Sequence, residues 1–472
     1  MTDTAIQTQT CDVRHADVTT LRDWLAQGQL DPVELVDHFT ANLNRQHHII
    51  NAATSVMDSA AREQAYQPLP GPLSGIPCSV KETLGIGGLP ITAGSMRMTP
   101  WVPETDSMVV ERLKRAGAIL LARGNVPEFA MTAESSNPRF GTTNNPLDPT
   151  RVAGGSSGGE AALVASGSVA FGVGSDILGS IRIPAACCGV VGFKPASHAV
   201  PKARTWPALD GFIDSWLAIG PITRTVRDAK LVYEVLSATT LPAPAPIQSA
   251  RLILPDGFPF TIESACIQQA LDHSIDVLRT AGMQPEGGDF SGVAEAYKLI
   301  APTMLHYLEP GWHTALNQQG RFSLLAETLA QLRGQPTIDG GLYRWVLLGK
   351  LLGGFLKPRS EAGVQKLIDR YLAIRTITQS MLGTNGILVL PAMGMLPPKH
   401  GDMNRLSLKP GLNRLISPLS FGNYCDLPTI AIPAPRFKDA TTGLIPSVMA
   451  MCAPGAEAML FAVAEELEQA LK

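Results

Sequence analysis

The sequence lacks several features that would place it in particular classes of protein. No stretch reaches the roughly 18–20 consecutive apolar residues that a membrane-spanning helix needs. The N-terminal segment is polar, with neither a basic region nor an apolar core, so we expect no secretory signal peptide and a cytoplasmic protein. The 472 residues carry a net charge of only −3 without a large basic patch, so nucleic acid is not an expected partner.

Cysteine and histidine are too scattered to suggest a metal site. The 7 cysteines form no CxxC pair, and their odd number argues against a disulfide framework. The 9 histidines show no HExxH or comparable ligand spacing. We therefore expect neither a metal nor another cofactor, and we interpret the adjacent Cys187 and Cys188 as small core residues.

Two short segments are rich in glycine and serine, at 154–159 and 174–180. Each precedes a predicted helix, at 160–165 and 181–188. Glycines at the start of a helix expose backbone N–H groups that stabilise an anion, either a bound phosphate or an oxyanion formed during a reaction. A serine at such a place can be a nucleophile. For either segment alone, a simple tight turn is the alternative interpretation.

Around these segments, the apolar pattern predicts alternating strands and helices, hence an α/β sheet covered by helices. Asp31 followed by Pro32 and Glu34 predicts a helix start. The predicted strands are at 51–57, 78–81, 119–122, 169–173, 386–391 and 427–433, and further helices are expected at 18–27, 106–117, about 225–236 and 456–472.

Residues 290–360 are expected to be helical, and one helix there has a broad apolar face. We interpret this face as part of the core or of a cap over the core. An exposed edge of a ligand pocket, or a patch for a membrane surface, is the alternative. The face consists of Trp345, Leu348, Leu351, Leu352, Phe355 and Leu356.

The residues alone leave two further chemistries open for the first segment. Residues 154–158 fit the pattern GxSxG, which suggests an α/β-hydrolase with Ser156 as the nucleophile. That fold needs a later histidine, and the best candidate, His400, stands in a loop without a supporting pattern. A phosphate-binding loop is the other possibility, but the sequence lacks GxxxxGK[ST]. Both interpretations leave the second segment without a role.

The order Lys81, Ser156, Ser180 and Arg182, at these spacings, resembles the amidase signature family. The resemblance extends over most of the chain and is absent only at about 240–385. It implies an α/β fold with a central mixed, twisted β-sheet covered on both faces by α-helices. It also implies a single domain over 1–472, with a signature core at about 70–236 and 386–472 and a variable, substrate-shaping region at about 290–360.

The same resemblance implies a role for each matching residue. Ser180 would be the nucleophile, Ser156 a bridging serine after a cis peptide bond, and Lys81 the base. Burial can lower the pKa of a lysine enough for it to act as a base, so this assignment is chemically coherent. The backbone N–H groups of the oxyanion hole would come from Ile177, Leu178, Gly179 and Ser180, support from Ser157, Asp176 and Arg182, and substrate contacts from Met131 and Leu178.

Two details of the sequence bear on the substrate. Most relatives have glycine where this chain has Leu178, and a leucine there adds bulk beside the oxyanion hole. Glu82, together with SSNPRFG and GGEAAL, is similar to the fatty acid amide hydrolase branch of the family. The apolar helices at 290–360 favour a hydrophobic or aryl substrate.

We therefore expect an enzyme that hydrolyses the C–N bond of a linear carboxylic amide, with possible activity on esters or carbamates. Its partner would be a small amide substrate, and the chain could form a homodimer. One alternative is the amidase subunit of a glutamine-dependent amidotransferase. Another is a catalytically silent binding protein on the same fold, against which the intact Lys81, Ser156 and Ser180 argue.

Overall fold

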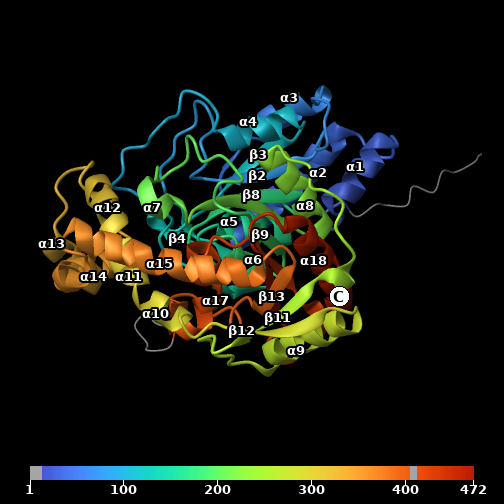
Figure 1. Cartoon of the computed structure of the whole chain (residues 1–472). Helices are drawn as coiled ribbons and strands as arrows, with labels where there is room; N and C mark the ends of the chain where they lie inside the picture. Colours follow the sequence, from blue (N-terminus) through green and yellow to red (C-terminus); the bar gives the residue numbers. More distant parts are fainter. Residues whose placement is uncertain (1–12, 404–411) are drawn as a thin grey trace, which may run out of the picture.

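The computed structural model of the protein describes residues 13–403 and 412–472, so the predictions for Cys11 and the first twelve residues lie outside the described part. A central 11-stranded sheet runs through the described molecule (Figure 1). Its strand order is β1 (Ala53–Val56), β3 (Ile119–Gly124), β2 (Pro77–Lys81), β8 (Phe171–Asp176), β10 (Ala218–Thr223), β9 (Val191–Lys194), β14 (Thr429–Pro433), β15 (Ser447–Met451), β13 (Gly386–Pro391), β11 (Arg251–Asp256) and β12 (Gln284–Asp289).

The sheet is mixed, as predicted. Strand β2 pairs in parallel with both β3 and β8, whereas β8, β10, β9, β14, β15 and β13 pair antiparallel in turn. Strands β11 and β12 continue parallel to β13 at the far edge. The strand before the second Gly/Ser segment is Phe171–Asp176, a few residues later than the predicted 169–173.

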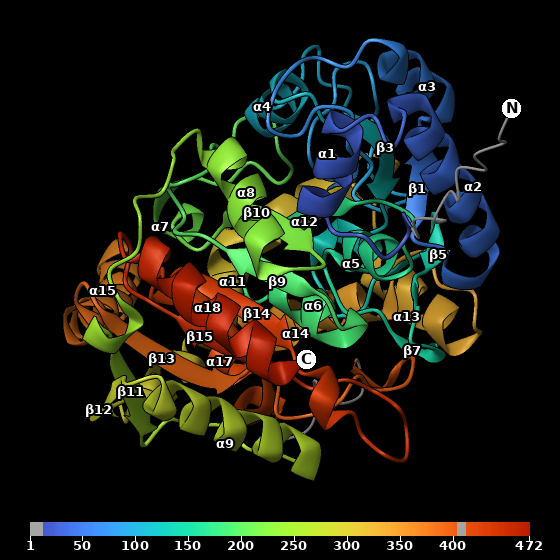
Figure 2. The same cartoon turned by 90° about the vertical axis from the view of Figure 1, so that its right-hand side faces the viewer.

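Helices cover both faces of this sheet, which confirms the predicted fold class. Helices α5 and α6 pack against β8, β9 and β14, while α8, α9 and α18 pack against the other side, where they lie in front of the sheet in Figure 2. The bounds are α5 (Gly158–Ala165), α6 (Arg182–Cys188), α8 (Val226–Ser237), α9 (Ala265–Thr280) and α18 (Glu457–Leu471). Cys187 and Cys188 are buried on α6, as predicted.

The remaining helices of the N-terminal part flank β1 and β3. Asp31 caps the second of them as predicted, since its Oδ1 accepts hydrogen bonds from the backbone N–H groups of Val33 (2.8 Å) and Glu34 (3.3 Å). These helices, with two nearby ones, are α1 (Val18–Ala26), α2 (Pro32–Ile50), α3 (Asp58–Tyr66), α4 (Met108–Arg115) and α7 (Gly211–Asp214).

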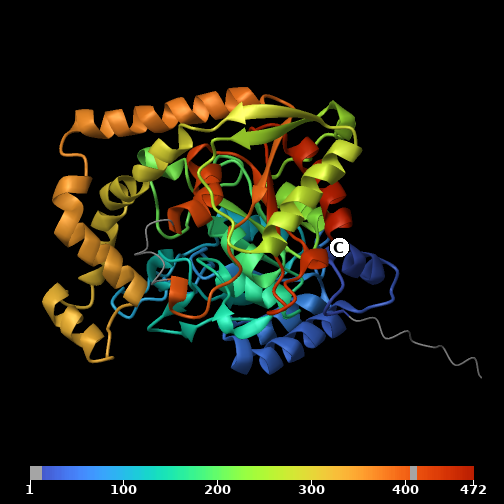
Figure 3. The same cartoon turned by 90° about the horizontal axis from the view of Figure 1, so that it is seen from below.

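The region 290–385 forms a group of helices beyond one side of the sheet, where α11 to α14 gather at the left of Figure 1. The long α15 runs along the edge of the molecule, and Figure 3 shows it from below. These helices are α10 (Val293–Lys298), α11 (Ile300–Tyr307), α12 (Glu309–Leu316), α13 (Leu324–Leu332), α14 (Gly340–Leu356) and α15 (Glu361–Leu382), and α17 (Leu412–Tyr424) follows them.

The predicted core face of α14 is wrong for three of its residues. Phe355 is 82% exposed, Leu351 64% and Leu352 46%. The helix instead buries the side on which Leu342 and Val346 lie. The apolar pattern misled because α14 is apolar around most of its circumference, so its composition does not define the buried side. Among the described residues, no helix is both long enough and apolar enough to cross a membrane.

Aromatic packing connects α15 to the sheet and to α17. The ring of Tyr371 on α15 lies 4.9 Å from that of Trp216 and 5.4 Å from that of Tyr424, measured between centroids. All three side chains are fully buried. Edge-to-face and tilted aromatic pairs of this kind add to the free energy gained by burial alone. They hold the peripheral helices against the segment that precedes β10, close to the serine-rich segments.

Candidate active site

Lys81 is the last residue of β2, and its side chain is fully buried between the two Gly/Ser segments. Its Nζ donates hydrogen bonds to Ser156 Oγ at 2.7 Å and to Ser175 Oγ at 3.0 Å. The backbone carbonyl of Ser175 accepts a third bond at 3.3 Å. These contacts satisfy the amine at a position where β2 and β8, adjacent parallel strands, both end.

The first segment presents Ser156 after a cis peptide bond between Gly155 and Ser156, the bond that the family resemblance implied. Ser157 follows, and its backbone N–H donates to the carbonyl oxygen of Ser180 at 3.0 Å. Its hydroxyl also donates to the Ser175 carbonyl at 3.3 Å. The first segment is thereby hydrogen-bonded to both ends of the second.

The second segment turns around the buried side chain of Asp176. One carboxylate oxygen accepts from the backbone N–H of Gly179 at 2.7 Å, and the other from that of Ile181 at 3.0 Å. Arg182 forms a buried ion pair with the same carboxylate, with N–O distances of 3.0 Å. Asn423 of α17 donates to it at 2.8 Å. The predicted supporting residues Asp176 and Arg182 are thus brought together, and they shape the loop that carries Ser180.

The ion pair keeps Asp176 charged inside the protein. Burial alone would raise the pKa of this carboxyl group, but the Arg182 guanidinium and the hydrogen bonds from Arg182, Asn423 and the Ile181 N–H hold the pKa well below its usual range. The loop therefore contains a fixed negative charge whose lone pairs are directed at backbone N–H groups.

This turn decides which backbone N–H groups remain for an oxyanion. The Gly179 N–H, predicted as one of the four donors, is already engaged by Asp176. Within the described residues, the N–H groups of Ile177, Leu178 and Ser180 have no protein acceptor. Three donors from the predicted set are therefore free for a bound group, and the fourth instead holds the shape of the loop.

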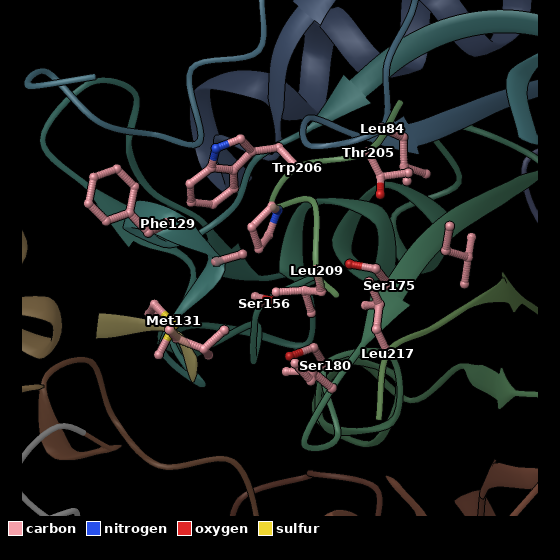
Figure 4. Close-up of a pocket in the computed structure, with 15 residues that line it drawn as sticks. Leu84, Phe129, Met131, Ser156, Ser175, Ser180, Thr205, Trp206, Leu209 and Leu217 are labelled. Carbon is pink, nitrogen blue, oxygen red and sulfur yellow. The ribbon is translucent and has the colours of Figure 1, made fainter. Parts of the chain in front are cut away.

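A pocket opens beside the serines, and Ser156, Ser175 and Ser180 all lie in its wall. Figure 4 shows Phe129 and Met131 to one side of Ser156 and Ser180, with Ser175 to the other side. No charged side chain is present among the described residues that line this pocket. The rest of the wall consists of Leu84, Ala130, Ile177, Thr205, Trp206, Pro207, Leu209, Leu217, Ile219 and Leu308.

The two predicted substrate contacts differ in position. Met131 lies in the pocket wall, next to the short 3-10 helix η1 (Glu128–Ala130). Leu178 does not line this pocket: its half-buried side chain packs against the hydrophobic core, and the preceding Ile177 faces the pocket. Consecutive residues of a tight turn point in different directions, so a position next to the pocket in sequence need not lie in its wall. A substrate contact of Leu178 stays a prediction.

Burial changes the proton affinity of Lys81 in the direction that the predicted base requires. Removal of the amine from water lowers its pKa, and the nearby carboxyl groups of Glu160 and Asp176 oppose the change only in part. Near neutral pH, a larger fraction of this lysine is therefore neutral than of a lysine on the surface. A neutral amine can accept a proton from the hydroxyl group of Ser156, to which it is already hydrogen-bonded.

The structure adds residues that the sequence did not single out. Ser175 contacts the Lys81 amine and lines the pocket, although it lies within the second Gly/Ser segment and could have been proposed from its place there. Asn423, which donates to Asp176, and Trp206 and Leu308 in the wall come from distant parts of the chain. Their sequence surroundings show no motif, so only the fold reveals them.

His400, the histidine that an α/β-hydrolase mechanism would need, is engaged elsewhere. Its Nδ1 lies 3.3 Å from a carboxylate oxygen of the buried Glu134, and its Nε2 lies 3.2 Å from the carbonyl of Pro149. It does not line the pocket that contains Ser156 and Ser180. A lysine, and not a histidine, is the base within reach of Ser156.

Fold and site together describe a protein with the architecture of a serine-dependent amidase. The family model "Amidase" matches residues 34–461. The chain belongs to the amidase family. A curated relative, one subunit of the glutamyl-tRNA(Gln) amidotransferase of Salinispora arenicola (strain CNS-205), is 37% identical over 258 residues, which is 51% of this chain and 52% of the relative. The alignment therefore spans about half the length of that relative.

Solved structures match over nearly the whole chain. One is described as a crystal structure of amidase, with a TM-score of 0.79 and 24% identity over 96% of this chain and 99% of that one. A fatty acid amide hydrolase matches with a TM-score of 0.73 and 20% identity over 97% of this chain and 85% of that one. At these identities the similarity shows the fold alone. The expected closeness to the fatty acid amide hydrolase branch stays a prediction.

Proposed function

We propose that the protein hydrolyses the C–N bond of a carboxylic amide through a covalent acyl intermediate on Ser180. The observation that carries the proposal is the 2.7 Å hydrogen bond from Lys81 Nζ to Ser156 Oγ, in a buried site beside a pocket that Ser180 lines. An amine with lowered basicity and two hydroxyl groups is a set of groups that can activate a serine without histidine.

In the proposed reaction, neutral Lys81 accepts the proton of the Ser156 hydroxyl, and Ser156 takes the proton of Ser180. The Ser180 oxygen attacks the carbonyl carbon. The amine leaves with a proton returned through Ser156, and water then cleaves the acyl ester by the same route. The free N–H groups of Ile177, Leu178 and Ser180 would bind the oxyanion, and each such donor typically contributes about 3 kcal/mol of transition-state stabilisation.

The pocket supports an uncharged, apolar or aryl acyl group as the substrate. Its described wall is built from aliphatic and aromatic side chains such as Phe129, Met131, Trp206 and Leu308. Burying apolar surface there is favourable, whereas a charged substrate would lose hydration without gaining a partner. Anilides and amides of apolar acids should therefore be hydrolysed best, with esters or carbamates as side reactions.

The amidase component of a glutamine-dependent amidotransferase is the second candidate, because the curated relative belongs to such an enzyme. Free glutamine carries an ammonium and a carboxylate group, and both need charged or strongly polar partners when bound. The described pocket wall supplies no charged group, which supports the hydrolase over this alternative. Hydrolysis of glutamine in preference to apolar amides would reverse this conclusion.

A screen of the purified chain tests the proposal. Anilides, fatty amides, primary amides, carbamates and glutamine are compared, and a fluorophosphonate probe is used to label the nucleophile. We expect turnover of apolar amides and a covalent adduct on Ser180 that mass spectrometry of the peptides locates. Absence of both turnover and labelling, in a folded protein, would instead indicate a silent binding protein.

A further inference from the structure

Glu160 is a fully buried carboxylic acid next to the proposed base that the mechanism above does not use. It lies in the first turn of α5, the helix that packs against β2, β3 and β8. Its carboxyl group lies directly against the backbone of β3, since a Cβ at Gly124 would be 1.9 Å from Oε1. A Cβ at Gly172 on β8 would likewise be 2.9 Å from Glu160 Cβ. Two glycines on the sheet thus make room for this one acid.

The register of the sheet places this carboxyl group beside Lys81. Gly124, against which the carboxyl packs, is the residue paired with Lys81 between β3 and β2. Ser79, two residues earlier on β2 and therefore on the same face, lies next to Gly172. Lys81 and Glu160 consequently approach each other on the same side of the sheet, one from the end of a strand and one from the start of a helix.

Neither carboxyl oxygen of Glu160 has a well-aligned hydrogen bond within the described residues. The backbone N–H groups of Gly124 and of Glu160 itself face the carboxyl group and favour its charged form, but only weakly. A buried acid left in this state costs free energy unless a nearby charge compensates it. Most buried acids of a folded protein are hydrogen-bonded, so this exception needs a physical reason.

The charged groups around the pair identify that reason. Glu160 is faced by Lys81 and by Arg123 of β3, whose guanidinium donates to the carbonyl oxygens of Pro90 and Glu82. Lys81 is faced by Glu160 and by Asp176. Asp176 is already neutralised by Arg182, so Glu160 is the acid whose charge is available to the lysine.

We propose that Glu160 is a positioning residue for the base: its carboxylate stabilises the ammonium group that forms when Lys81 takes the proton of Ser156. This inference rests on the proposed function. In that step the O–H bond of Ser156 breaks and an N–H bond of Lys81 forms, while Glu160 itself exchanges no proton. The acid compensates part of the cost of creating a positive charge in a buried site. Burial lowers the pKa of Lys81 and raises that of Glu160, and each group opposes the change in the other.

The pH dependence of Ser180 labelling by one fluorophosphonate probe tests this role in the full-length chain. The labelling rate of the wild-type protein should rise with pH as Lys81 loses its proton. Glu160→Gln removes the charge and keeps the size of the side chain, so the pKa of Lys81 should fall. The acid limb should move down by roughly one pH unit or more. Because the amine is then a weaker base, the plateau rate should drop roughly three- to tenfold.

Two further variants keep the test interpretable. Glu160→Met, which is apolar and of similar size, carries the same expectation if the glutamine variant does not fold. Glu82→Gln is the matched control: Glu82 is also buried and follows Lys81 in sequence, but its carboxylate accepts from Thr92 and Ala93. That variant should leave the acid limb in place.

The outcomes separate this inference from the function on which it rests. An unchanged acid limb in Glu160→Gln, whether the rate is normal or reduced at every pH, would overturn the role of Glu160 and leave Lys81 as the base. Wild-type labelling in Lys81→Ala would overturn the proposed function itself. A shifted limb in Glu160→Gln, with none in Glu82→Gln, would support the inference.

Discussion

The backbone N–H of Ser157 donates a 3.0 Å hydrogen bond to the carbonyl oxygen of Ser180. This bond joins the two Gly/Ser segments at the point where each presents a reactive hydroxyl group. Ser156 and Ser180 are therefore held by one continuous backbone framework, although separate loops carry them. Such preorganisation matters because proton transfer and attack both require the groups to be in place before the reaction.

The first prediction concerns Ser180 itself. Ser180→Ala removes the proposed nucleophile while the backbone bond from Ser157 remains, so the fold should be retained. Amide turnover should fall by at least about a thousandfold, and fluorophosphonate labelling should disappear. Ser157→Ala, which leaves both proposed reactive hydroxyl groups intact, should reduce the rate far less. Substantial turnover by Ser180→Ala would contradict the assignment.

The second prediction concerns the fixed charge in the loop. Asp176→Asn leaves the buried Arg182 without its anion, and breaking a buried pair in this way costs about 3–5 kcal/mol of the free energy of unfolding. Chemical denaturation at neutral pH measures the loss. Because the folded-state pKa of Asp176 is lowered, its contribution is fully present above the unfolded pKa. It is lost only as pH falls through the folded pKa, so the two proteins should converge in strong acid.

The exposed pair of Asp37 and Arg62 provides the control for this comparison. Its N–O distance is the same 3.0 Å, but both side chains are about half exposed. Asp37→Asn should therefore change the free energy of unfolding by less than about 1 kcal/mol. A similar loss in the two variants would show that burial does not govern the strength of the pair at Asp176.

The third prediction concerns Glu128, which precedes the pocket residue Phe129. Burial raises its pKa to about 7, although Ser95 and the Asp339 N–H donate to its carboxylate. The folded protein then binds a proton that the unfolded chain has released, so stability should decrease as pH rises from about 4.5 to 7. Glu128→Gln should reduce that decrease. Melting temperatures across this range, with buffer ionisation matched, provide the measurement.

The fourth prediction concerns the shape of the pocket. Trp206→Ala removes a large apolar surface from the wall and should weaken binding of bulky aryl amides, typically by about 3 kcal/mol or less. The loss should appear as a raised KM for the bulky substrate, with a smaller effect for a short acyl chain. Trp101→Ala serves as the control because Trp101 is 39% exposed and lies outside the pocket wall.

Sequence reasoning reached the ends of the strands more easily than the wall of the pocket. Lys81, Ser156 and Asp176 stand in short segments whose glycines and flanking apolar runs already indicate strand ends and helix starts. Trp206 and Leu308 carry no such local pattern, because their importance comes only from where the chain folds back over the serines. The sequence likewise could not identify the hydrogen bond by which Asp176 occupies the Gly179 N–H.

The helices at 290–360 show the other limit. Their existence followed from apolar spacing, but α14 is apolar around most of its circumference, and the pattern does not decide which side is buried. The structure exposes Phe355 and Leu351 and buries Val346. Burial depends on which neighbouring elements are present, and that information is tertiary.

The origin of the pocket wall has a consequence for how such a protein can change. Lys81 and Ser180 stand where the strands of the sheet end, whereas Met131, Trp206 and Leu308 come from connecting segments and peripheral helices. Replacement of the connecting segments can alter which acyl group fits without moving the groups that transfer protons. The same catalytic unit could therefore be adapted to a new amide by exchange of loops alone, a practical route to enzymes of altered selectivity.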